Sequence, residues 1–174
     1  MRAAVGLGVV MVVVAFVWMN LIRREELEAA LRLSDVAWLL PGAGAGVVFA
    51  AVVWWLGHDL PAMQRIAQML ARALDLKAMR FRHVFWFSLL AALPEEVLFR
   101  GAVQATLGLV LAALIFGALH ALTVLYFVYA AGAGLFLGLL YQWTGTLWTP
   151  IGAHFTIDLV MFLLLLGRRH HLTT

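Results

Sequence analysis

The chain contains apolar runs long enough to cross a lipid bilayer, and these runs take up most of its length. A transmembrane helix needs about 20 mostly apolar residues. The runs cover residues 3–22, 37–57, 84–107, 109–122, 124–142 and 147–166. With 65% hydrophobic and 12% charged residues, the chain is too apolar for a soluble domain, in which about a quarter of the residues are charged. We therefore predict an all-α, polytopic transmembrane helix bundle of about six spans.

The 174 residues leave no room for a separate soluble domain, so we expect 1–174 to form a single membrane domain. Within it, 1–83 would supply the N-terminal spans and an interfacial helix, and 84–166 the core spans that carry polar side chains. The charged segments 23–35 and 61–82 have apolar residues at helical spacing and are predicted to lie at the membrane surface. The first run ends without a small-residue cleavage site, which indicates a retained span rather than a signal peptide.

Lys and Arg gather at the ends of the apolar runs and give a net charge of +3. This distribution is typical of membrane topology signals and not of a nucleic-acid-binding surface. Six spans would place the basic residues of 61–82, Arg168 and both chain ends on one side, which the positive-inside rule makes cytoplasmic. We expect the lipid bilayer as a partner and no nucleic acid. With no cysteine, disulfides, thiolate metal ligands and a cysteine nucleophile are excluded.

Small residues predict where helices approach one another closely. Gly42 with Gly46, and Gly134 with Gly138, are pairs spaced by four residues. In lipid, such pairs allow helix backbones to pack at short distance. We interpret both pairs as helix-packing sites without chemistry.

Six ionisable side chains lie inside the apolar runs, where each charge costs on the order of 3 kcal/mol. They are Glu95, Glu96, Arg100, His120, His154 and Asp158. Without compensation the total would be on the order of 10 kcal/mol, comparable with the stability of a whole domain. We therefore expect these side chains to face one another in the interior of the bundle.

Helical spacing places the two adjacent glutamates on different faces of the helix. Glu96 and Arg100 are four residues apart and share one helix face, whereas Glu95 is rotated by about 100°. This predicts an ion pair between Glu96 and Arg100 and a Glu95 side chain that points into a cavity. Pro94 is expected to kink the helix or to begin a new segment. A salt bridge that only fixes helix register would explain Glu96 and Arg100 but would leave Glu95 without a partner.

The histidines complete this polar set. His154 and Asp158 are four residues apart on a helix that begins near Thr149, so they share one cavity wall. His120 follows Phe116 by four residues, which places the aromatic ring beside the imidazole. Carboxylates and imidazoles together suit activation of a water and stabilisation of an oxyanion. The same side chains also suit a zinc ion, and both alternatives stay open here; the metal ligands would be Glu95, His120, His154 and Asp158.

Three motifs resemble those of a known family: PEEVLFRG at 94–101, FGALH at 116–120, and LLYQWTGTLWTPIGAHFTID at 139–158. The chain resembles the CAAX protease and bacteriocin-processing family, also called the Abi or CPBP family, which includes the Ras-converting CAAX endopeptidase. The family motifs EExxxR, FxxxH and HxxxN or HxxxD occur here in order, each within an apolar run. The resemblance covers roughly 90–160.

The resemblance implies an intramembrane endopeptidase of prokaryotic type, acting on a peptide or protein at the membrane. In it, Glu95 with His120 would activate a water, and His154 with Asp158 would bind the oxyanion or complete the site. Glu96 and Arg100 would hold the third helix in place. Asp158 departs from the asparagine of many members, and an ionised carboxylate is a poorer oxyanion donor but a better metal ligand. For this family both a metal and a glutamate-activated water are proposed.

Two other kinds of protein remain as alternatives. A non-enzymatic immunity factor or scaffold would keep the polar cluster only for helix register. A transporter or proton relay would also bury carboxylates and histidines within its spans.

Overall fold

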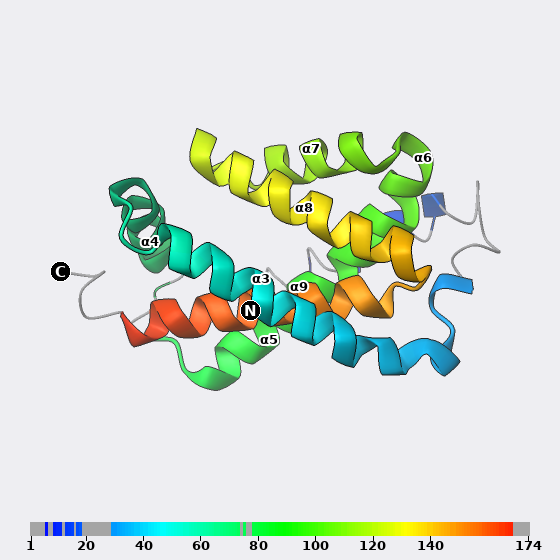
Figure 1. Ribbon diagram of the computed structural model, residues 1–174, viewed down its shortest axis with the longest axis horizontal. Helices are drawn as coiled ribbons and strands as arrows, with labels where there is room; N and C mark the ends of the chain where they lie inside the picture. Colours follow the sequence, from blue (N-terminus) through cyan, green and yellow to red (C-terminus); the bar gives the residue numbers. More distant parts are fainter. Residues whose placement is uncertain are drawn as a thin grey trace.

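The computed structural model describes residues 29–73, 75 and 78–168, together with nine residues between Gly6 and Trp18. The described chain consists of helices and the turns that join them, as predicted. The elements are η1 (Leu33–Trp38), α3 (Leu39–Gly57), α4 (Pro61–Ala73), α5 (Phe81–Glu96), η2 (Val97–Gln104), α6 (Ala105–Leu107), α7 (Leu109–Leu119), α8 (Val124–Thr144) and α9 (Trp148–Gly167). Figure 1 shows the longer helices running roughly along the long axis of the molecule.

Among the described residues, three helical segments are long and apolar enough to cross a membrane. They are Leu33–Gly57, Val124–Thr144 and Trp148–Gly167. The third predicted run, 84–107, is formed by α5, η2 and α6 in succession, while the first, 3–22, falls largely outside the described residues.

The fourth predicted span is shorter than predicted. Helix α7 has 11 residues, which at 1.5 Å per residue is roughly half of the 30 Å hydrocarbon core. It is preceded by Gly108, whose φ of 83° breaks the helix, and it ends before His120. Helix α7 is therefore too short to cross the hydrocarbon core by itself, and the length predicted for the run 109–122 is not met.

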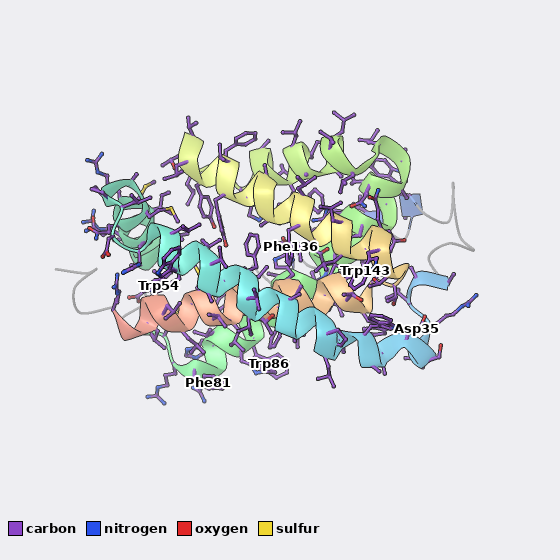
Figure 2. All side chains as sticks on the ribbon, in the orientation of Figure 1. Asp35, Trp54, Phe81, Trp86, Phe136 and Trp143 are labelled. Atoms are coloured by element: carbon purple, nitrogen blue, oxygen red, sulfur yellow. The ribbon has the colours of Figure 1, made fainter. Side chains whose placement is uncertain are left out.

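Many large apolar side chains lie on the surface, and a charged pair lies in the interior. Leu40 and Trp143 are 78% and 79% exposed, whereas Glu96 and Arg100 are both 0% exposed. In Figure 2, Phe81 and Trp86 project outward from α5. Charged side chains are almost never fully buried unless they are paired, as these two are. The many exposed apolar side chains suit a lipid environment, and the long apolar helices indicate a membrane protein.

Helix α9 lies at the centre of the bundle and packs against both α3 and α5. Helices α3 and α9 run parallel (Figure 1), and a Cβ atom at Gly42 or Gly46 would collide with the backbone of Thr149 or Ala153. The Thr156 hydroxyl also donates to the Ala43 carbonyl at 3.0 Å. The predicted packing role of the first glycine pair is confirmed.

The second glycine pair lies on α8, where α8 meets α7 and η2. A Cβ atom at Gly134 would lie 3.3 Å from the Ala113 Cα atom, and one at Gly138 would collide with the side chains of Leu109 and Gln104. This pair also serves helix packing, as predicted. Together α7 and α8 cover the side of the bundle opposite α5 (Figure 1).

The helix that carries Glu95 changes its geometry shortly after Pro94. Helix α5 continues through Pro94 to Glu96, and a π-helix, η2, begins at Val97. The new segment predicted near Pro94 is therefore present as a change in the hydrogen-bonding pattern. The helix itself does not break. Short π-helical turns occur often at functional sites.

The predicted interfacial segment 61–82 divides into two elements. Helix α4 ends at Ala73, and α5 begins at Phe81. Figure 1 views α4 nearly end-on while α3 and α9 run across the picture, so α4 lies crosswise to the spans. A crosswise amphipathic helix at one end of the bundle is suited to the membrane surface. Most of the other predicted interfacial segment, 23–35, lies outside the described residues.

The two ends of the bundle carry different amounts of basic charge. Helix α4, the start of α5 and the end of α9 gather at one end, and η1 lies at the other (Figure 1). The first end therefore holds Arg65, Arg72, Arg80, Arg82 and Arg168, and the second holds Arg32. The predicted segregation of basic residues is present among the described residues. That the more basic end faces the cytoplasm stays a prediction.

Candidate active site

Four elements bring the predicted site residues together in the middle of the bundle. The end of α5 supplies both glutamates, and η2 supplies Arg100. His120 directly follows α7, and α9 supplies His154 and Asp158. The residues that meet there are Glu95, Glu96, Arg100, Phe116, His120, His154 and Asp158.

Glu96 is completely buried and bridges two helices. Its Oε2 atom accepts a hydrogen bond from Arg100 Nε at 2.8 Å, the ion pair that the spacing predicts. Its Oε1 atom accepts from His154 Nδ1, also at 2.8 Å. Because an ionised carboxylate can only accept, the Nδ1 atom must carry a proton. The His154 ring is thereby fixed with its Nε2 atom toward the opposite side.

Glu95 has a different environment from its neighbour. Its Oε2 atom is buried, and among the described residues no donor lies within hydrogen-bonding distance of it. Two imidazole nitrogens approach this oxygen: His120 Nε2 at 3.7 Å and His154 Nε2 at 3.9 Å. These separations are too long for direct hydrogen bonds. One unpaired carboxylate oxygen thus faces two ring nitrogens across a narrow gap.

The orientation of His120 is set by the last turn of α7. Its Nδ1 atom lies 2.8 Å from the Phe116 carbonyl oxygen, and its ring stacks on that of Phe116 at 4.3 Å between centroids. A carbonyl oxygen only accepts, so Nδ1 is again the protonated nitrogen and Nε2 faces Glu95. Phe116 lies near His154 too, with centroids 6.0 Å apart in an edge-on arrangement. The predicted Phe116–His120 contact is confirmed.

Asp158 lies one turn beyond His154 on the same face of α9. Its Oδ2 atom is 3.7 Å from His154 Nε2. His154 therefore has one carboxylate, Glu96, bonded to its Nδ1 atom and two more, Glu95 and Asp158, near its Nε2 atom. Carboxylate groups thus lie near both nitrogens of the ring.

These side chains face a cavity of about 220 Å³, which we call the polar cavity. Its polar wall consists of Glu95, His120, His154 and Asp158, and Phe87, Leu137 and Ile157 contribute to its apolar walls. The side chains of His120 and Asp158 are 32% and 27% exposed, so the cavity is not sealed from the outside. Such a combination of apolar walls with a few convergent polar groups is typical of a ligand or active site.

A hydrogen-bonded chain behind the cavity includes a residue that the sequence reasoning missed. Arg100 Nη1 donates to Gln104 Oε1 at 3.4 Å, and Gln104 Nε2 donates to the Gly138 carbonyl oxygen at 3.0 Å. Gln104 is four residues beyond Arg100 and eight beyond Glu96, a spacing visible in the sequence. Tyr126 and Tyr129, which line the polar cavity, were also missed, because an aromatic on an apolar helix carries no distinguishing pattern.

The metal alternative finds no support in the geometry. Among the described residues, no group of three or more His, Asp or Glu side chains is arranged to hold a metal ion. The zinc site predicted as an alternative is therefore not supported among the described residues, and no step is derived through a metal.

Residues 77–160 match the model of a family described as type II CAAX prenyl endopeptidase, Rce1-like. The matched range contains every residue of the polar cluster. This part of the chain is an Rce1-like domain. It bears out the resemblance found in the motifs and extends it toward the N-terminal end, to residue 77.

The Rce1-like domain also has a curated bacterial relative. The chain is 46% identical over 81 residues to the uncharacterized protein YpbD of Bacillus subtilis (strain 168). The alignment covers 45% of this chain and 43% of YpbD, so it spans less than half of that relative's length. No solved structure matches the chain significantly.

Proposed function

We propose that the Rce1-like domain is an intramembrane endopeptidase that hydrolyses a peptide bond with a water activated by Glu95 and His120. The supporting observation is the buried Glu95 Oε2 atom, which faces two imidazole Nε2 atoms at 3.7 Å and 3.9 Å. A water between these three atoms would be within hydrogen-bonding distance of each. The substrate is a peptide or protein segment that reaches the polar cavity from the membrane.

In this reaction Glu95 takes one proton from the water while the water oxygen forms a bond to the carbonyl carbon of the substrate. The carbonyl oxygen becomes negatively charged in the tetrahedral intermediate. The C–N bond then breaks, and Glu95 returns the proton to the leaving amine nitrogen. A carboxylate that is free of any structural hydrogen bond is suited to carry a proton in both directions.

His154 is the candidate for stabilising the oxyanion. Its Nδ1–H group is bonded to Glu96, so a second proton on Nε2 would point into the polar cavity as a charged donor. Asp158 lies 3.7 Å from that nitrogen, so its carboxylate is close enough to interact with this donor. In this proposal Asp158 acts through His154 and does not contact the oxyanion, which accounts for an acidic side chain at this position.

The test is cleavage of an internally quenched peptide by the purified protein in lipid nanodiscs. Glu95→Gln removes the base but keeps the size of the side chain, and we expect kcat to fall roughly a hundredfold or more. Asp59→Asn is the matched control, because its carboxylate side chain is 84% exposed and lies outside the polar cavity. Unchanged cleavage by Glu95→Gln would exclude the proposed base and favour a scaffold whose polar cluster is only structural.

A further inference from the structure

A second hollow lies beneath α4, and we call it the apolar pocket. It has a volume of about 80 Å³ and is enclosed by α3, α4, α8 and α9. Its walls include Val53, Ile66, Leu70, Met161 and Leu165. It contains none of the charged residues of the polar cavity, and its only formal charge is that of Arg168.

Two tyrosines stand between this pocket and the polar cavity. Of the residues that the structure describes, Tyr126 and Tyr129 alone line both hollows. They are three residues apart on α8, so they project from the same face of the helix. Their rings stack with 5.7 Å between centroids and 30° between planes. The pair therefore forms a two-ring wall with one hollow on each side.

The wall is supported at both ends. The ring of Tyr129 lies 6.4 Å from that of Phe49 on α3, and Phe49 stacks on Phe136 at 4.8 Å. Figure 2 shows Phe136 lying between α8 and α3. At the other end, the Thr123 hydroxyl accepts from the Tyr126 amide at 3.1 Å and fixes the start of α8. Ring packing on one side and a capped helix on the other hold both tyrosines in place.

We propose that Tyr126 and Tyr129 set the upper size limit for the substrate side chain next to the cleaved bond. This inference rests on the proposed peptidase function. A side chain that enters the polar cavity meets the rings of Tyr126 and Tyr129, which line it. Removal of a ring joins the polar cavity to the apolar pocket, and the added space has walls that favour apolar groups. The tyrosines thus act on the choice of substrate and not on the chemistry.

Peptides that differ only in the residue beside the cleaved bond test this limit. We would compare alanine, leucine, phenylalanine and biphenylalanine at that position, using Tyr126→Ala and Tyr129→Ala. In these variants we expect kcat/KM for the biphenyl peptide, relative to the alanine peptide, to rise roughly tenfold to a hundredfold, the scale on which pockets discriminate by size. An unchanged ratio in variants that still cleave the alanine peptide overturns the proposal.

Two kinds of control separate the size of the ring from other effects. Tyr126→Phe and Tyr129→Phe keep the wall, so we expect their ratio to equal that of the wild type. Trp143→Ala truncates an aromatic residue on the same helix that is 79% exposed and lines neither hollow. A raised ratio in Trp143→Ala would mean that general loosening of α8, not the wall, controls substrate size. Tyr129→Val replaces Tyr129→Ala if the alanine variant does not fold.

A chemical measurement tests the wall without any peptidase activity. The chain has no cysteine, so Ala133→Cys places a single thiol in the polar cavity. We expect the labelling rate with a benzophenone methanethiosulfonate, relative to the methyl reagent, to rise when Tyr129→Ala is added. An unchanged ratio overturns the inference. If the wild-type protein cleaves none of the peptides but the labelling ratio rises with Tyr129→Ala, the two-ring wall is supported. In that case the proposed peptidase function is rejected.

Discussion

Glu95 and Glu96 are adjacent in the chain, yet their carboxylates have unlike surroundings. Glu96 uses both oxygens, one for Arg100 and one for His154, whereas Glu95 keeps a buried oxygen without a bonded donor. The rotation of about 100° between neighbouring helical residues is the cause, because it aims one side chain at the interior of the bundle and the other at the polar cavity. Two glutamates at consecutive positions can thus have different roles: Glu96 is structural, and Glu95 is the proposed chemical group.

The substitution Glu96→Gln tests whether that bridge orients His154. Arg100 and His154 bond to different oxygens of Glu96, and glutamine has an oxygen at only one of these two positions, so it cannot keep both bonds in place. An amide N–H facing Nδ1 would reverse the tautomer of the ring. We expect kcat to fall on the order of a hundredfold or more with KM little changed, as is typical when the partner of a catalytic histidine is altered. A fall confined to protein yield, with kcat unchanged, would show that Glu96 acts only in folding.

Chelation is predicted to leave the reaction intact. No group that could hold a metal ion is found among the described residues, and the proposed water contacts protein groups alone. Incubation with 1,10-phenanthroline or EDTA, followed by removal of the chelator, is expected to leave kcat/KM within a factor of two, roughly the reproducibility of such rates. Elemental mass spectrometry on the same samples is the check. Loss of activity that zinc restores would contradict the prediction.

Helical spacing was sufficient to predict contacts within one helix and insufficient for contacts between helices. The Glu96–Arg100 pair and the Phe116–His120 stack each join residues four apart. The His154–Glu96 bond joins residues 58 apart, and no periodicity says which helices are neighbours. The motifs implied a shared site, but its distances depend on how α5, α7 and α9 pack.

At the scale of the helices, close packing of α3 on α9 gives the sharpest comparison. Gly46→Ala would drive a methyl group into the Ala153 backbone, and the neighbouring Gly44→Ala meets nothing within 4 Å. We expect the first to lower the free energy of unfolding by about 1–3 kcal/mol, as overpacking does. The second should be neutral or stabilise the helix by up to about 1 kcal/mol. Unfolding in mixed micelles measures both, and equal effects would contradict the assigned contact.

The apolar runs predicted the existence of the helices better than their lengths or geometry. Hydropathy marked 109–122 as a run, but Gly108 and the turn at His120 limit the helix to Leu109–Leu119. The π-helix over Val97–Gln104 had no signal beyond the preceding proline. Both features depend on backbone hydrogen bonds that are chosen when neighbouring helices pack, so composition does not contain them.

For the whole molecule, the uneven basic charge predicts an orientation in the membrane. Single cysteines at Arg72 on α4 and at Ser34 on η1 occupy exposed positions at opposite ends of the bundle in a chain that has no other thiol. With the more basic end cytoplasmic, an impermeant maleimide should label Ser34→Cys in intact cells. Arg72→Cys should react only after the cells are opened. The reverse pattern would invert the predicted topology.

The position of the buried ion pair also bears on how the chain enters the membrane during synthesis. Glu96 and Arg100 belong to one stretch of helix, so they can neutralise each other as that stretch leaves the ribosome and is inserted. His154, the other partner of Glu96, is made 58 residues later. Glu95 has no charge partner of its own within this stretch, and it can interact with both His120 and His154 only after α9 is complete. In nascent chains that are stopped before α9, this stretch should therefore be less stably inserted in the bilayer than it is in the finished protein.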